Sequence, residues 1–366
     1  MARTLKSDKP LYLATLALLF SSLVMVYSAS AVVAGERLGQ PYFFLFRQIA
    51  WLAIGVGLLV AVMRIDYRRL KRPVVVWTVL GVTTAALIAV LFAPPINGTR
   101  RWFGIAGFGV QPSEIAKLAV ILFVAAFLDR RMAQGDDLAR SVLPLSAVTA
   151  GVAGLILLGP DFGTAFTLLV IATGMVFAAG LSYRYFIGIG LVALPALVAV
   201  LASAEYRRRR LFVFLDPWAD PLDSGFQLAQ SQIAVGTGGL FGRGVMGGVQ
   251  KLFFLPEPHT DFIYAVIAEE TGLVGATAIL LCFAVIIWRG LRVTRNAPDP
   301  FGSLLAFGIT AMLALQAFMN MSVVLSLMPT TGLPLPFVSF GGSSLMTSLL
   351  GMAVLLNISQ HASAAT

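Results

Sequence analysis

Ten long apolar runs divide this chain of 366 residues, and they restrict its fold more than any other feature. Most are near the length of about 20 residues that an α-helix needs to cross the hydrocarbon region of a bilayer. No water reaches the backbone there, so each run must satisfy its own N–H and C=O groups as a helix. The runs lie near 11–33, 43–63, 74–93, 113–128, 142–159, 164–179, 185–202, 262–288, 304–325 and 343–358.

The composition excludes a water-soluble domain. Hydrophobic residues make up 58% of the chain and charged residues 12%, whereas soluble domains carry about 25% charged residues. The single cysteine, Cys282, lies in an apolar run, so one chain cannot build a disulfide or a cysteine-ligated metal site. We therefore predict an all-α polytopic membrane protein, a single domain over 1–366, with about ten transmembrane helices and one long extracytoplasmic loop near 203–261.

The distribution of lysine and arginine predicts the orientation. The amino terminus and the loops after spans two, four, six and eight together hold 15 of these residues, and the short loops of the opposite side hold Arg37, Arg100 and Arg101. The positive-inside rule then places both termini in the cytoplasm and the long loop outside. The net charge of +9 is thus a signal for topology and anionic lipid, and we expect no nucleic-acid partner.

The long loop ends in a polar cluster, PEPHTD at 256–261, directly before span eight. Asp261 has two interpretations: a general base at the membrane surface, or an N-cap of the following helix. Its position alone favours the cap. His259 suits proton relay or metal binding, but also a simple loop hydrogen bond. The same ambiguity applies to Glu257.

Several ionisable residues lie inside predicted spans, where they are costly and face a polar interior. Glu114 and Lys117 are spaced i and i+3 on one helix, so they form either a self-compensated pair or the wall of a cavity. Glu269 and Glu270 in span eight fit an ion pair or a functional site equally well. Arg47 in span two either faces the interior or reaches the lipid head groups.

Arginines are abundant at the predicted outer face, and arginine matches phosphate geometry well. They suggest a substrate with a phosphate or pyrophosphate head, although binding to lipid head groups also explains them. This group contains Arg100, Arg101 and the run from Arg207 to Arg210. In the same long loop, the pattern of 226–235 predicts a short amphipathic helix.

Five long motifs follow one another along the chain: NGTRRWFGIAGFGVQPSEIAKLA (97–119), LGPDFGTA (158–165), DPWADPLDSGFQLAQSQIAVGTGGLFGRG (216–244), KLFFLPEPHTDFIYAVIAEETGLVG (251–275) and MPTTGLPLPFVSFGGSSL (328–345). Together they resemble the SEDS family of cell-wall polymerases over nearly the whole chain. Stretches 25–31, 64–72, 216–221 and 251–262 are more similar to the division branch of that family than to its elongation branch.

This resemblance implies a peptidoglycan glycosyltransferase that polymerises lipid II, the undecaprenyl-pyrophosphate-linked disaccharide peptide, during cell division. The reaction takes place at the outer face of the bacterial cytoplasmic membrane. The implied partners are a class B penicillin-binding protein and other proteins of the division or elongation machinery. No organic cofactor and no dedicated metal site are implied, and a divalent cation such as Mg²⁺ or Mn²⁺ suits the pyrophosphate.

The resemblance also assigns roles to residues. Asp261 matches the essential acid of the family, which reverses the preference from cap to catalysis and makes it the candidate general base. Glu114 and Lys117 match a polar pair of the central cavity. Substrate contacts are expected from these two and from His259 and the outward cations Arg100, Arg101, Arg207, Arg210, Arg243 and Lys251.

Three alternatives remain for the function. An elongation-type polymerase performs the same chemistry. A lipid II flippase needs a polar path that continues to the cytoplasmic side, whereas a polymerase can keep its chemistry in the outer half. A scaffold that only recruits division proteins leaves the buried pair Glu114 and Lys117 without a purpose.

Overall fold

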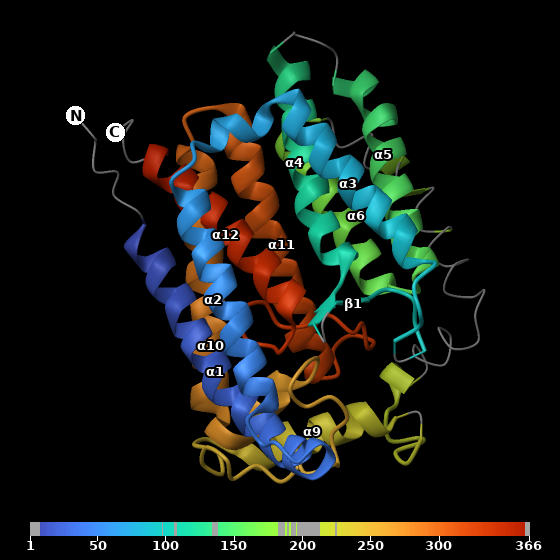
Figure 1. The fold of residues 1–366 in the computed structure, drawn as a ribbon, viewed down its shortest axis with the longest axis vertical. Coiled ribbons are helices and arrows are strands. Elements are labelled where there is room, and N and C mark those ends of the chain that lie inside the picture. Colours follow the sequence, from blue (N-terminus) through green and yellow to red (C-terminus); the bar gives the residue numbers. More distant parts are fainter. Residues whose placement is uncertain are drawn as a thin grey trace.

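A computed structural model shows a bundle of long helices that run side by side (Figure 1). It describes residues 8–96, 98–105, 108–133, 138–181, 187, 188, 190, 191, 195, 213–223 and 225–362. Nine of the predicted spans correspond to described helices: α1 (Lys9–Leu38), α2 (Phe43–Met63), α3 (Pro73–Val90), α4 (Pro112–Ala133), α5 (Leu138–Leu158), α6 (Phe162–Ala178), α10 (Ile263–Asn296), α11 (Pro300–Val324) and α12 (Gly342–Ala362). The seventh predicted span, near 185–202, lies mostly outside the described residues.

The described helices have the length and polarity of membrane spans. Six of them, α1, α2, α3, α10, α11 and α12, are long and apolar enough to cross a bilayer. The helices differ in burial. In the most apolar stretch of α12, 83% of the residues are buried inside the protein, whereas the figure for α2 is 22%, so α12 is an inner helix and α2 an outer one. Apolar side chains that stay exposed on the outer helices are suited to lipid. The prediction of a polytopic all-α membrane domain is thus confirmed.

Aspartates at three helix starts explain where these helices begin. Asp8 accepts a hydrogen bond from the backbone N–H of Leu11, and Asp299 accepts one from Gly302 at the start of α11. Asp161 does the same for Thr164 in α6. Each carboxylate satisfies a backbone donor that has no partner within its own helix.

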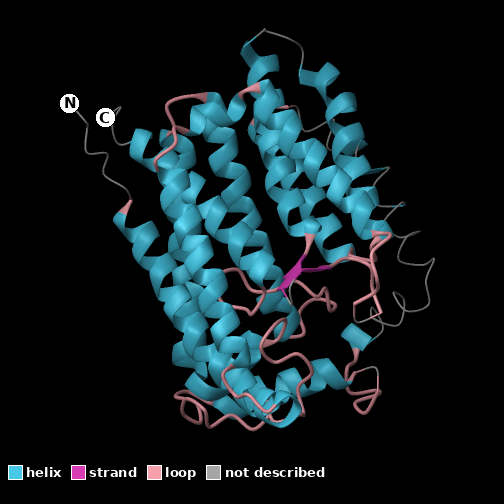
Figure 2. Cartoon of the chain, viewed as in Figure 1, coloured by secondary structure: helices cyan, strands magenta, loops and turns pink. Residues whose placement is uncertain are grey.

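The two ends of the bundle differ. One end holds the 3-10 helix η1 (Tyr67–Lys71), the start of α1 and the end of α12: the N–H of Asp8 donates to Ser359 Oγ, and Asn357 Nδ2 donates to the carbonyl of Met63 just before η1. The opposite end carries the longest connections, which Figure 2 shows as converging loops. They include α9 (Phe226–Gly238), which confirms the short helix predicted there, and a hairpin of β1 (Phe103–Ile105) and β2 (Phe108–Val110).

This hairpin is a short strand pair in a loop of the all-α domain, and the sequence did not predict it. Its antiparallel register pairs Phe103 with Val110 and Gly104 with Gly109. It lies in the connection between α3 and α4, outside any helix, where a folded loop must find partners for its backbone groups. Three-residue strands are too short to leave a readable alternation in the sequence.

α10 contains a break at Gly272, whose φ of 66° and ψ of −165° are not helical. Only glycine adopts this backbone region readily. The break separates a first segment of two turns, 263–271, from the remainder of the helix. That first segment follows directly on Asp261, so the break governs the surroundings of the candidate site.

Candidate functional site

A cavity of about 890 Å³ opens among the loops at the end of the bundle away from η1. Its walls come from segments far apart in the sequence: α2, the connection before α4, the α5–α6 turn, the loop before α10 and the segment between α11 and α12. The polar residues of the lining are Arg47, Thr99, Arg101, Gln111, Glu257, Thr260, Asp261, Thr330, Thr331 and Ser344. Two arginines and two acids thus share one space.

Asp261 lines this cavity and is not an N-cap. The helical conformation of α10 starts at Ile263, and the N-cap position is Phe262, whose side chain makes no capping hydrogen bond. The chain enters α10 through a turn, so the helix begins one residue later than the capping interpretation requires. That interpretation is therefore wrong. The backbone oxygen of Asp261 accepts a hydrogen bond of 2.7 Å from Asn320 Nδ2 on α11.

The segment after α11 forms the wall next to Asp261. A Cβ atom on Gly332, which has φ +70°, would lie 3.6 Å from Asp261 Oδ2. Asn320 Nδ2 also donates to the carbonyl of Leu333 at 2.8 Å. One amide side chain thus links the loop before α10 to the segment after α11. Ser339 Oγ adds a second link by donating to the carbonyl of Thr260 at 2.6 Å.

Two arginines supply positive charge to the cavity. Arg47, whose orientation the sequence left open, lines the cavity, and its guanidinium lies 4.1 Å from the centre of the Phe43 ring. Arg101 lines it too, with Nε donating to Thr99 Oγ1 at 3.1 Å. Guanidinium groups in this position suit a phosphate or pyrophosphate.

The other predicted cations lie elsewhere. Arg100 is exposed and donates to the carbonyl of Leu91 at 3.2 Å, while Arg243 is exposed on the long loop. Lys251 is buried at 2% exposure in an ion pair of 2.5 Å with Glu270. None of the three lines the cavity. The predicted substrate contacts Arg207 and Arg210 lie outside the described residues.

Glu114 and Lys117 form a buried pair next to the cavity, not in its lining. Lys117 Nζ donates to Glu114 Oε1 at 2.8 Å, and both residues are 2% exposed or less. This geometry is the self-compensated pair. The cavity floor is instead held by Asp161, which accepts hydrogen bonds from Gln111 Nε2 at 2.8 Å and Ser113 Oγ at 2.9 Å.

His259 is buried beside the cavity and does not line it. Its ring packs between Phe44 of α2 and Phe340, with ring centres 4.4 Å and 5.6 Å away. Burial lowers the pKa of His259, and the nearby charge of Glu257 acts in the opposite sense. The imidazole is therefore neutral at pH 7 and stabilises the loop by packing.

We expect acid to destabilise this loop through His259. A histidine whose pKa is lowered by folding takes up a proton more readily in the unfolded chain, so stability falls as the pH drops below about 6.5. His259→Phe, which suits the aromatic surroundings, should reduce the loss of melting temperature between about pH 7.5 and pH 5.5. His361→Gln changes the only other histidine and should retain the wild-type pH profile. Equal losses in wild type and His259→Phe would contradict this assignment.

Two acids of the cavity lining suit a divalent cation near the arginines. The described residues contain no cluster of three or more His, Cys, Asp or Glu side chains able to hold a metal ion. Glu257 and Asp261, four residues apart, both line the cavity. Magnesium needs one or two protein carboxylates when substrate phosphates supply further oxygens. The residues therefore fit a cation that arrives with a pyrophosphate.

Comparison with known proteins decides the family. The family model described as "Cell cycle protein", which covers FtsW, RodA and SpoVE, matches residues 9–364. The chain belongs to this family. The SEDS resemblance of its motifs is thereby confirmed, and the chain is a multi-pass membrane glycosyltransferase.

Curated SEDS relatives match almost end to end. Stage V sporulation protein E of Bacillus subtilis is 42% identical over 359 residues, which is 97% of each chain. A probable peptidoglycan glycosyltransferase FtsW of Geobacter sp. strain M18 is 45% identical over 342 residues, 92% of each chain.

Solved SEDS structures share the whole fold. One chain from a peptidoglycan synthase complex that coordinates polymerization and crosslinking aligns with a TM-score of 0.79 and 32% identity, covering 98% of this chain and 99% of that one. The rod shape determining protein RodA of Thermus thermophilus aligns with a TM-score of 0.71 and 29% identity, covering 97% of each chain.

Proposed function

We propose that this SEDS protein polymerises lipid II into glycan strands, and that the cavity around Asp261 is its active site. One observation carries the proposal: two acids and two arginines, from three separate segments, line a single cavity at one end of the bundle. This combination matches a reaction that needs a base for a sugar hydroxyl and cations for a pyrophosphate leaving group.

Asp261 acts in this mechanism as the general base. The attacking sugar hydroxyl gives its proton to the Asp261 carboxylate as its oxygen bonds to the anomeric carbon of the donor. The bond from that carbon to the pyrophosphate oxygen breaks, and its electron pair leaves with the pyrophosphate. The start of α10 follows Asp261 directly, and a helix N-terminus stabilises nearby negative charge.

Arg47 and Arg101 stabilise the pyrophosphate in this mechanism, where charge grows as the sugar leaves. Glu257 and Asp261 would hold a divalent cation, Mg²⁺ or Mn²⁺, which would neutralise part of the same charge when bound. Glu257 has a left-handed backbone with φ 50°, and such strained positions cluster at functional sites.

The neighbouring arginines allow a matched test of substrate binding. Arg101 lines the cavity and Arg100 does not. Arg101→Gln should raise the KM for lipid II about tenfold, because a charge-assisted hydrogen bond to phosphate is lost. Arg100→Gln should change KM by less than about twofold. Equal effects of the two substitutions in a steady-state polymerisation assay would contradict the role of Arg101.

A polymerase is favoured over a flippase by the position of the polar groups. The lining residues of the cavity come from the loops and helix ends that converge at the end of the bundle away from η1. The buried polar groups next to it, Glu114 and Lys117, neutralise each other. A transport path instead needs polar groups that continue to the other side.

Purified protein in detergent separates these functions, since transport has no meaning without a membrane. With lipid II, a divalent cation and its partner present, the chain should form glycan polymer that a muramidase degrades. Absence of polymer, together with movement of lipid II across reconstituted vesicles, would support the flippase and overturn the proposal.

The setting of the reaction follows from the same proposal. The start of α1 and the end of α12 lie together at the end of the bundle that carries η1, and the lysine and arginine bias supports a cytoplasmic location for that end in the bacterial cytoplasmic membrane. The related structure from a synthase complex supports a class B penicillin-binding protein as partner. Several relatives named FtsW, at identities of up to 45% over nearly the whole chain, support the division branch.

A further inference from the structure

The loop that leads to Asp261 is built into the break of α10. In a regular helix the N–H groups of Leu273 and Val274 would bond to the carbonyls of Glu269 and Glu270. At the break they donate instead to Gly239 and Leu240 of the loop, at 2.9 Å and 3.2 Å. The freed carbonyls of Glu269 and Glu270 accept hydrogen bonds from the N–H groups of residues 243 and 244, at 3.0 Å and 2.9 Å. The loop thus replaces the missing helical bonds one for one.

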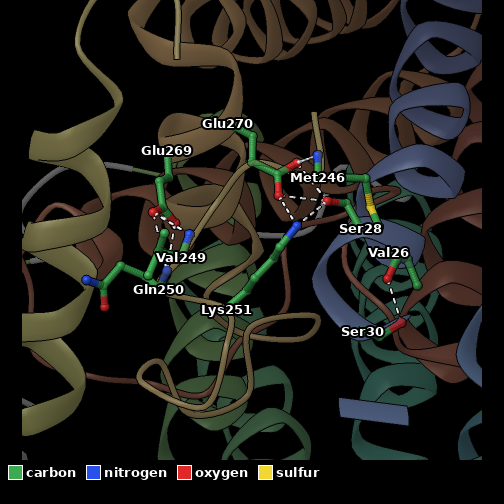
Figure 3. Close-up of polar contacts among 9 residues, drawn as sticks. All are labelled: Val26, Ser28, Ser30, Met246, Val249, Gln250, Lys251, Glu269 and Glu270. Atoms are coloured by element: carbon green, nitrogen blue, oxygen red, sulfur yellow. Dashed lines mark hydrogen bonds and ion pairs between the residues drawn. The ribbon is translucent and has the colours of Figure 1, made fainter. Parts of the chain in front are cut away.

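The side chains of the same two glutamates hold the next part of the loop (Figure 3). Glu269 accepts from the N–H groups of Val249 at 2.8 Å and Gln250 at 3.2 Å. Glu270 accepts from the N–H of Met246 at 3.0 Å and from Lys251 Nζ at 2.5 Å. Both carboxylates point away from α10 into the loop.

Helix α1 completes this arrangement through Ser28. Its Oγ donates to Glu270 at 2.7 Å and accepts from Lys251 Nζ at 2.9 Å. Lys251 is 2% exposed and Glu270 is 1% exposed. Lys251 thus has an acid and a hydroxyl as partners away from the cavity, which it does not line, so its contacts are those of a structural ion pair rather than of a substrate ligand.

These contacts close a loop around Asp261. Lys251 fixes the start of the segment 252–262, and the first turns of α10 fix its end. Both anchors belong to one rigid unit, because Glu270 lies in those first turns. Asp261 is the last cavity residue of the closed segment. Release of Lys251 would therefore loosen the segment 252–262 and, against the hydrogen bonds of Asn320 and Ser339 at its end, disturb the position of the Asp261 carboxylate.

We propose that Lys251 and Glu270 are positioning residues for Asp261, joined in an ionic clasp with Ser28. The inference rests on the proposed role of Asp261 as base. A base must lie within hydrogen-bond reach of the hydroxyl that it deprotonates, and a displacement of about 1 Å costs up to about 100-fold in rate.

The test removes both charges of the clasp at once in the full chain, assembled with its partner. Lys251→Met with Glu270→Gln leaves no unpaired buried ion, so folding is retained. We expect kcat for lipid II polymerisation to fall about 10- to 100-fold while KM stays within about twofold. Backbone amides of 253–262 should exchange their hydrogens faster.

An ion pair at the other end of the same helices provides the control. Arg289 of α10 binds Asp8 before α1 at 2.5 Å, so Asp8→Asn with Arg289→Met breaks a similar link far from the cavity. This control should keep kcat and the exchange of 253–262 unchanged. A raised KM with normal kcat in the clasp variant would overturn the proposal and make Lys251 a substrate ligand. Unchanged kcat would overturn it as well.

The experiment distinguishes an error in the clasp proposal from an error in the proposed function. If wild-type protein makes no polymer, the proposed function is wrong, and the hydrogen exchange of 253–262 still tests the clasp. If wild type makes polymer and the clasp variant matches it in kcat and exchange, only the clasp is wrong.

Discussion

Asp261→Asn should lower the rate of lipid II polymerisation by about 10²- to 10⁴-fold, the range that a general base contributes. Asparagine has nearly the same shape but cannot accept the hydroxyl proton. Because Asp261 does not cap α10, the substitution removes no capping bond, and the melting temperature should stay close to that of wild type. Initial rates at saturating lipid II, measured with the partner present, provide the comparison.

The matched control is an exposed carboxylate near the same end of the bundle. Glu36 near the end of α1 is exposed and does not line the cavity. Glu36→Gln should therefore retain the wild-type rate. Wild-type rate and product length in Asp261→Asn would remove Asp261 from the mechanism.

Gly272→Ala should have the largest effect on stability. A Cβ at this position would lie 2.4 Å from the backbone nitrogen of Gly242, and the φ of +66° already disfavours any other residue. The strained backbone and the displaced loop together should cost about 3 kcal/mol or more in unfolding free energy. We expect a clear drop in melting temperature in detergent. Polymerisation should also be lost, because the loop that leads to Asp261 would lose its hydrogen bonds to the break in α10.

Gly81→Ala is the control for this substitution. Gly81 also lies inside a helix, α3, but a Cβ there would meet no atom within 4 Å. Alanine favours a helix interior by about 1 kcal/mol over glycine, so this variant should be as stable as wild type or slightly more stable. Equal melting temperatures for Gly272→Ala and Gly81→Ala would contradict the structure of the break.

The spans and local pairs were within reach of sequence reasoning. Apolar length alone predicts nine described helices, because a membrane helix must be apolar over its whole length. The contact of Glu114 with Lys117 follows from i, i+3 spacing on one helix. The location of Asp261 in a polar cluster at the membrane surface could also be predicted.

Long-range partners could not be predicted in the same way. Arg47 and Arg101 share the cavity, and Lys251 binds Glu270, only because the tertiary fold brings different helices and loops together. The spacing of residues in the sequence does not predict such long-range contacts. The choice between cap and cavity for Asp261 depended on whether α10 starts one residue earlier or later, a distinction finer than sequence patterns provide.

A structure of the chain with a lipid II analogue bound would test the central claim most directly. We expect the pyrophosphate beside the guanidinium groups of Arg47 and Arg101, and a sugar hydroxyl within about 3 Å of the Asp261 carboxylate. A pyrophosphate bound outside this cavity, with no sugar hydroxyl near Asp261, would contradict the account.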